Sequence, residues 1–241
     1  MRTFLALLLS LFAGAALAAT PEEDVQRYLA VFSDTLADTD KAVEELGWKG
    51  ISDPRLYDVI EERLLVEAPK VGRSKIDRNR IGHYIRGLGF SGQEKYARTI
   101  SSFLDEKGWG RHARTSLEDL KLYARWNPII SSRDTFDPQY SDDVNRVRNM
   151  LRSDDRMLQK LGAKCVYHRH ANETVLLDLL AGQLLASYKT ASDPESMDAV
   201  AWMVKGIGKS ANSKYVPVLQ EVSRSGDGKV SREASGWLRR M

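Results

Sequence analysis

Cysteine, proline and net charge are all scarce in this 241-residue chain, and each shortage excludes a class of protein. One cysteine cannot form an internal disulfide, so the fold is not a disulfide-stapled miniprotein. Seven prolines and 17 glycines are too few for a collagen-like or extended disordered chain. The net charge of +3 lacks the concentrated positive charge of phosphate binders, so nucleic acid is not an expected partner.

Long hydrophobic runs are also missing, with one exception at the start of the chain. Arg2 precedes an uncharged segment, Phe4 to Ala18, whose 15 residues fall short of the roughly 20 that span a bilayer. The segment ends in Ala16-Leu17-Ala18, the small-residue pattern of a signal-peptidase site. We therefore expect residues 1–18 to be a cleaved signal peptide. The mature chain should then be periplasmic or secreted, without a membrane span and away from cytoplasmic nucleotides and chromosomal DNA.

The rest of the chain has the apolar spacing of amphipathic helices. Apolar residues recur at i, i+3, i+4 and i+7, as in Val25, Tyr28, Leu29 and Phe32. Two helix starts are marked by a capping aspartate followed by proline, in Ser52-Asp53-Pro54 and Ser192-Asp193-Pro194. No stretch alternates convincingly as a strand, so the sequence predicts an all-α fold.

An internal repeat indicates how the helices are organised. The segments 81–100 and 200–219 align without gaps at an offset of 119 positions. They share five identities, namely Gly87/Gly206, Gly89/Gly208, Ser91/Ser210, Lys95/Lys214 and Tyr96/Tyr215. Each segment reads as a helix that ends in glycine, a tight turn, and the start of a second helix. Such a unit cannot bury its own apolar stripe without neighbours on both sides.

These glycine-turn-tyrosine segments resemble the HEAT-repeat family, and with the signal peptide the chain resembles exported bacterial HEAT-repeat proteins. The resemblance implies a right-handed α-solenoid of about five helix pairs over residues 53–241, after an N-terminal helical cap at 19–52. We expect an irregular joint near residues 127–140. The expected pairs are Asp53–Ala68 with Lys75–Leu88, Gly92–Glu106 with Trp109–Trp126, Ser141–Arg152 with Asp154–Arg169, Asn172–Lys189 with Glu195–Gly208, and Asn212–Ser225 with Lys229–Arg240.

Chemistry-bearing patterns are few. Cys165, His168 and His170 form the one metal-like cluster, in which a thiolate and imidazoles could hold zinc or copper. On a helix His168 and His170 point about 200° apart, so we favour a buried cysteine beside two surface histidines. The chain has no nucleophile elbow, zinc-protease motif or phosphate loop, and carboxylate pairs read as helix-end or solvated charges. We therefore expect no cofactor, no catalysis and no small-molecule substrate.

One helix face combines aromatic rings with cations in both copies of the repeat. Aromatic residues and arginine are the commonest hot spots of protein interfaces, and the second helices of HEAT units usually line the concave side. We expect this face to contribute to a partner groove, unless the aromatic rings prove to be packed in the core. The candidate residues are His83, Arg86 and Phe90 in the first copy, and Asp198, Trp202, Lys205 and Lys209 in the second.

The sequence thus favours a non-catalytic exported scaffold that binds a protein partner. Two alternatives remain open: a metal-binding protein or enzyme that uses Cys165, His168 and His170, and a binder of an anionic polymer. The second follows from the charge distribution, because residues 19–70 carry 13 acidic and six basic groups whereas residues 71–241 carry 20 acidic and 29 basic groups.

Overall fold

The computed structural model describes residues 21–34, 37–72, 74–225 and 228–241, so the expected signal peptide lies outside the described residues. The described chain is all-α, as the sequence predicts, and contains no strand. Its helices are α1 Pro21–Ser33, α2 Thr39–Lys49, α3 Pro54–Glu67, α4 Lys75–Phe90, α5 Ala97–Ser101, α6 Gly110–Ile130, α7 Asp142–Arg152, α8 Arg156–Arg169, α9 Thr174–Ser187, α10 Pro194–Lys209, α11 Val216–Ser225 and α12 Gly228–Leu238.

The predicted helix starts are confirmed by the capping contacts. The Asp53 side chain accepts a hydrogen bond from the Arg55 amide, and Pro54 occupies the first turn of α3. Asp193 caps α10 in the same way, because its side chain accepts from the amides of Glu195 and Ser196. Each cap satisfies amides that have no partner within the helix, which is why both helices begin at the proline.

The irregular joint begins later than the sequence predicts. The prediction is wrong for residues 127–130, because α6 continues through Pro128 to Ile130. The Asn127 amide donates to the carbonyls of Phe90 (3.0 Å) and Ser91 (3.2 Å), and Ile130 is fully buried. These contacts outweigh the hydrogen bond that a proline removes from a helix.

The first helix of the second expected pair is also shorter than predicted. Of the expected helix 92–106, only α5 at 97–101 is α-helical, preceded by a 3-10 turn at 94–96. After it, hydrogen bonds from Phe103 to Ile100 and from Leu104 to Ser101 tighten the backbone into successive turns. The Phe103 and Trp109 rings meet edge to face at 6.0 Å and close this loop onto the start of α6.

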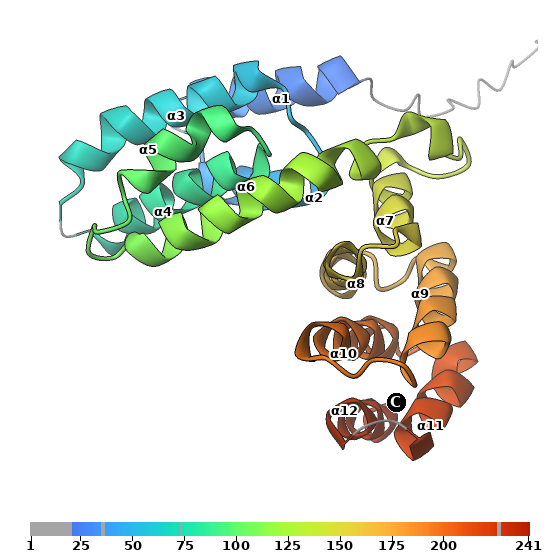
Figure 1. The fold of residues 1–241 in the computed structure, drawn as a ribbon. Coiled ribbons are helices and arrows are strands. Elements are labelled where there is room, and N and C mark those ends of the chain that lie inside the picture. The colour runs from blue at the N-terminus through green and yellow to red at the C-terminus, as the bar shows by residue number, and fades with distance from the viewer. Residues whose placement is uncertain (1–20, 35–36, 73, 226–227) are drawn as a thin grey trace, which may run out of the picture.

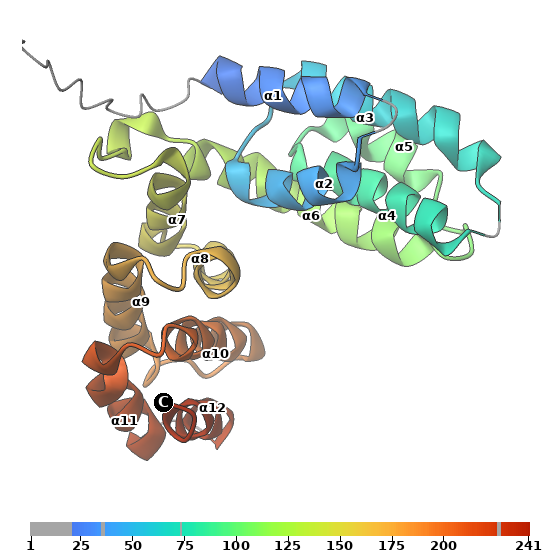
Figure 2. The same ribbon diagram turned by 180° about the vertical axis from the view of Figure 1, so that it is seen from behind.

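The twelve helices form two arms, each built from two layers (Figures 1 and 2). In the first arm, α1–α6, the odd-numbered helices lie on one side and the even-numbered helices on the other. The second arm, α7–α12, repeats this arrangement and runs in a different direction, so the molecule is bent. Two apolar clusters are buried. The first lies mainly in α1–α6 and extends across the joint to Met150 of α7 and Leu158 of α8, and the second lies in α7–α12.

The two copies of the sequence repeat make the same side-chain contacts in the two arms. Tyr96 donates its hydroxyl proton to Asp58 (2.8 Å), and Lys95 pairs with the same carboxylate (2.5 Å). In the second arm Tyr215 donates to Asp178 (2.8 Å), and Lys214 pairs with it (2.6 Å). Tyr96 thereby links the turn after α4 to α3, and Tyr215 links the turn after α10 to α9. We call these two sets of contacts the tyrosine locks.

The correspondence extends beyond the aligned segment. Helices α3 and α9 have 14 residues each and begin 120 positions apart, at Pro54 and Thr174. Helices α4 and α10 have 16 residues each and begin at Lys75 and Pro194. The correspondence covers these two pairs of helices, whereas α6 and α12 differ in length, with 21 and 11 residues.

Candidate functional site: an aromatic and cationic cleft between the arms

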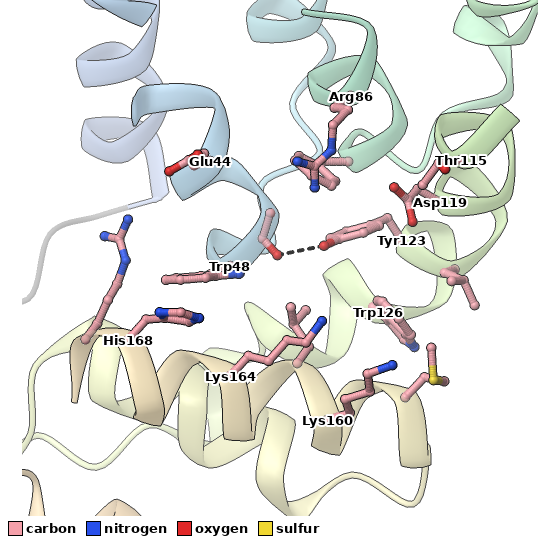
Figure 3. A pocket seen from close by; sticks show the side chains of 16 residues that line it. Glu44, Trp48, Arg86, Thr115, Asp119, Tyr123, Trp126, Lys160, Lys164 and His168 are labelled. Atoms are coloured by element: carbon pink, nitrogen blue, oxygen red, sulfur yellow. Dashed lines mark hydrogen bonds between the residues drawn. The ribbon is translucent and has the colours of Figure 1, made fainter. Parts of the chain in front are cut away.

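A cleft of about 570 Å³ lies between the inner helices of the first arm and helix α8 of the second (Figure 3). Its lining side chains come from α2, α4 and α6 on one side and from α8 on the other. Trp48, Trp126 and Lys164 lie around the open space, with Arg86 above them. We call this the inter-arm cleft.

Aromatic rings form the wall contributed by the first arm. Phe90 and Tyr123 pack with ring centroids 4.9 Å apart, and Tyr123 meets Trp126 at 5.3 Å. The Tyr123 hydroxyl donates to the Gly47 carbonyl (2.9 Å), and Trp126 Nε1 donates to Asp155 (2.8 Å). Because both polar tips are bonded, the wall presents its apolar surface in a fixed orientation.

Trp48 connects the wall to the second arm. Its ring stacks on His168 with centroids 6.3 Å apart, and the Arg169 guanidinium lies 4.5 Å from its centroid. Arg169 also pairs with Glu45 (3.1 Å). Trp48 packs against the hydrophobic clusters of both arms. The α2 to α8 contact is therefore built from stacking, a cation over a ring and an ion pair.

The cations around the cleft differ in their partners. Lys160 pairs with Asp198 (2.7 Å). For Arg86 and Lys164, no carboxylate oxygen of the described residues lies within 4.0 Å. Burial lowers the pKa of Lys164, and the nearby charges of Lys160, Arg86 and Lys205 lower it further, whereas Asp198 opposes them. Lys164 is thus a half-buried cation among other cations.

Asp119 is a half-buried carboxyl group that lines the cleft. Burial raises its pKa to about 6, the Arg86 charge opposes this, and Glu118 adds to it. The group therefore titrates near neutral pH, well above the usual range of an aspartate. The inter-arm cleft consequently becomes more negative as the pH rises through about 6.

The aromatic and cationic face continues from α8 onto α10. The Trp202 ring lies 4.5 Å from Lys205 Nζ and 5.1 Å from Lys164 Nζ, measured to the ring centroid. Trp202 also approaches His168 (6.1 Å) and Tyr167 (5.8 Å). Neighbouring helices therefore bring residues that are distant in the sequence onto one surface.

The structure places the seven predicted partner residues in three groups. Arg86 and Phe90 line the inter-arm cleft, although Phe90 is only 5% exposed and belongs to the core of the first arm. Trp202, Lys205 and Lys209 lie on α10 beside it, and Lys209 is exposed. The remaining two are engaged in pairs, His83 with Asp40 (2.8 Å) and Asp198 with Lys160 and Lys229.

Sequence reasoning missed Trp48, Trp126, Asp119 and Lys164. One signal was available, since Lys160 and Lys164 are four positions apart on a predicted helix and so share a face. The other three belong to helices whose neighbours could not be identified from spacing alone.

The possible metal ligands do not converge. Cys165 is 2% exposed in the core of the second arm, and burial raises its thiol pKa to about 12. His168 is exposed against Trp48, whereas burial lowers the pKa of His170 just beyond the end of α8. In the part of the chain that the structure describes, no group of three or more His, Cys, Asp or Glu side chains could hold a metal ion.

None of the described helices is both long enough and apolar enough to cross a membrane. No family model, no curated protein and no solved structure matches the chain.

Proposed function

We propose that this chain is an exported, non-catalytic scaffold that binds a protein partner in the cell envelope. The observation that carries the proposal is the inter-arm cleft with its continuation onto α10, where tryptophan rings and cations share one concave surface. Tryptophan and arginine dominate the binding energy of protein interfaces, and clefts between helical layers are common binding sites.

The fold belongs to the same proposal. We infer a right-handed solenoid of five HEAT-type helix pairs, α3/α4 to α11/α12, with α1 and α2 as a cap. Support comes from the two-layer order of the helices and from the tyrosine locks that recur in both arms (Figure 1). In repeat proteins of this kind each pair packs on its neighbours and the concave surface binds other macromolecules.

The alternative functions have less support. A metal-binding role would need Cys165 to leave the core and join the two histidines, because its thiol is buried. Binding of an anionic polymer rests on the excess of basic residues after residue 70. Such binding should weaken steeply with salt, which separates it from binding at an aromatic surface.

Affinity capture with matched variants tests the proposal. The mature chain, immobilised, should capture envelope proteins that the double variant Trp202→Ala with Arg86→Ala does not retain. The control is Trp109→Ala with Arg111→Ala, which also removes one ring and one cation but lies at the opposite end of α6 from Trp126. Equal capture by both folded double variants and the wild type would contradict the proposal.

A further inference from the structure

Three cations in or beside the inter-arm cleft form no ion pair with the described residues. They are Arg86 on α4, Lys164 on α8 and Lys205 on α10, and no carboxylate oxygen in the described ranges lies within 4.0 Å of their charged nitrogens. Lys164 and Lys205 both lie over the Trp202 ring, at 5.1 and 4.5 Å from its centroid. Lys164 thus lies close enough to both Arg86 and Lys205 to interact with their charges.

This arrangement disfavours the charged form of Lys164. Burial and the neighbouring cations lower its pKa, so its charged form is less favourable in the empty cleft than in water. An anion seated among the three cations would oppose both effects. Because charged hydrogen bonds are strong where water is partly excluded, the site is suited to an anionic group.

The other lining residues restrict what can carry that anion. The half-buried indole rings of Trp48 in the cleft and of Trp202 on the adjoining face of α10 offer apolar surface. Glu44 and Asp119 also line the cleft, and Asp198 lies near Lys160. A polymer with a charge on every unit, such as a polyphosphate or a sulfated glycan, would meet these carboxylates as well as the cations. A chain whose anionic groups are separated by apolar groups avoids that repulsion.

We propose that the inter-arm cleft and the adjoining face of α10 bind an acidic segment of a protein, with carboxylates held by Arg86, Lys164 and Lys205 and apolar side chains against Trp48 and Trp202. This inference rests on the proposed function and names the chemistry of the partner. The carboxylates complement the unpartnered cations, and the apolar side chains cover indole surface that solvent now contacts.

Peptide titration of the mature chain tests the inference. The probe is an acetylated, amidated peptide of alternating glutamate and phenylalanine, with matched peptides in which glutamine or lysine replaces glutamate. Binding is followed by NMR of the five tryptophan indole groups. We expect the signals of Trp48 and Trp202 to shift with the glutamate peptide, while that of Trp109, bonded to the Arg78 carbonyl (2.9 Å), stays fixed.

Charge variants assign the effect to the cleft. Lys164→Gln should weaken the glutamate peptide roughly tenfold, as expected for the loss of one charge-assisted hydrogen bond. Lys164→Arg should retain most of the affinity because it keeps the charge. The control Lys107→Gln removes an exposed lysine ahead of α6 and should leave the affinity unchanged.

Three results would overturn the inference. They are equal binding of the glutamine peptide, tighter binding of a heparin oligosaccharide that shifts the same indole signals, and no shift with the glutamate peptide. If capture of envelope proteins still depends on Trp202 and Arg86, the protein-binding role survives and only the acidic occupant is rejected.

Discussion

Asp119 is a single residue at which the cleft and the stability of the fold are linked. Its pKa of about 6 in the folded chain, against the ordinary 3.8, means that the folded state binds this proton more tightly than the unfolded state. The stabilisation from protonation is therefore complete below about pH 4 and is lost as the pH rises through about 6. Above that pH, the half-buried carboxylate lowers the free energy of unfolding.

Replacing Asp119 by asparagine should remove this penalty. We expect Asp119→Asn to raise the free energy of unfolding by about 1–3 kcal/mol at pH 8 and to have little effect at pH 4. Urea unfolding at the two pH values measures the difference. Glu118→Gln, at the exposed neighbouring position, serves as the control and should show no such pH dependence. A gain of equal size at both pH values would contradict the explanation.

The tyrosine locks give a second prediction at the residue scale. Tyr96→Phe and Tyr215→Phe each remove a hydroxyl that donates to a carboxylate, and each should lower the free energy of unfolding by about 1–2 kcal/mol. The two losses should add within about 0.5 kcal/mol, because the locks lie in different arms. Tyr167→Phe, whose ring packs on Trp202, is the control in chemical denaturation. A strong departure from additivity would show that the arms do not respond separately.

Some contacts of single residues could be predicted from the sequence, and others could not. The repeat predicted that Tyr96 and Tyr215 occupy equivalent positions, and their contacts are equivalent. Trp48 and His168 are 120 positions apart in the sequence, and nothing in their local spacing indicates that they stack. Periodicity identifies the face of a helix, whereas a cleft depends on which helices meet.

At the scale of elements, the turn after α4 and the turn after α10 both need a residue with positive φ, and they use different residues for it. Gly92 has φ +67°, and a Cβ there would lie 2.5 Å from the Ala124 amide nitrogen. At the matching place in the second arm, Ala211 has φ +50° and is exposed. The first turn therefore requires glycine for space and conformation, whereas the second tolerates the strain of an alanine.

Opposite substitutions at these two positions should have opposite effects. Ala211→Gly relieves the left-handed strain and should raise the free energy of unfolding by about 0.5–1 kcal/mol. Gly92→Ala should lower it by about 3 kcal/mol or more, since backbone atoms of α6 must move. Thermal and urea unfolding compare the pair. Destabilisation by Ala211→Gly would mean that this turn is not strained.

The ends of helices could be predicted from the sequence where a capping residue and an apolar stripe agreed. They could not be predicted where tertiary contacts determined the end of the helix. Helix α10 begins at Pro194, as its capping aspartate predicts. Helix α6 passes through Pro128 because Asn127 and Ile130 are held by the first arm. Composition therefore marks a probable break in a helix, and packing determines whether the break occurs.

At the scale of the molecule, the joint between the arms contains a buried ion pair. Asp24 of α1 and Arg146 of α7 are 4% and 5% exposed and pair directly. Arg146 also pairs with Asp143 (3.1 Å), and Lys49 of α2 pairs with the same carboxylate. Removing one member of a buried pair leaves a charge without compensation, whereas replacing both members by apolar groups can be neutral.

A mutant cycle at this joint should show that asymmetry. Asp24→Leu alone should lower the free energy of unfolding by about 2–4 kcal/mol, and Asp24→Leu with Arg146→Met should recover most of the loss. We expect the single variant also to separate the unfolding of the arms, because most buried apolar residues of the two arms belong to different clusters. Urea unfolding followed by tryptophan fluorescence measures both effects. A single variant that loses less than about 1 kcal/mol would contradict this account of the joint.

The start of α1 lies at this joint and not at an end of the molecule (Figure 1). Pro21 lines a cavity of about 330 Å³ together with Ser131, Arg133 and Arg146. A tether that pulled on Pro21 would therefore load the elbow between the arms, and the Asp24–Arg146 pair would bear much of the force. The far ends of both arms would stay mechanically unloaded.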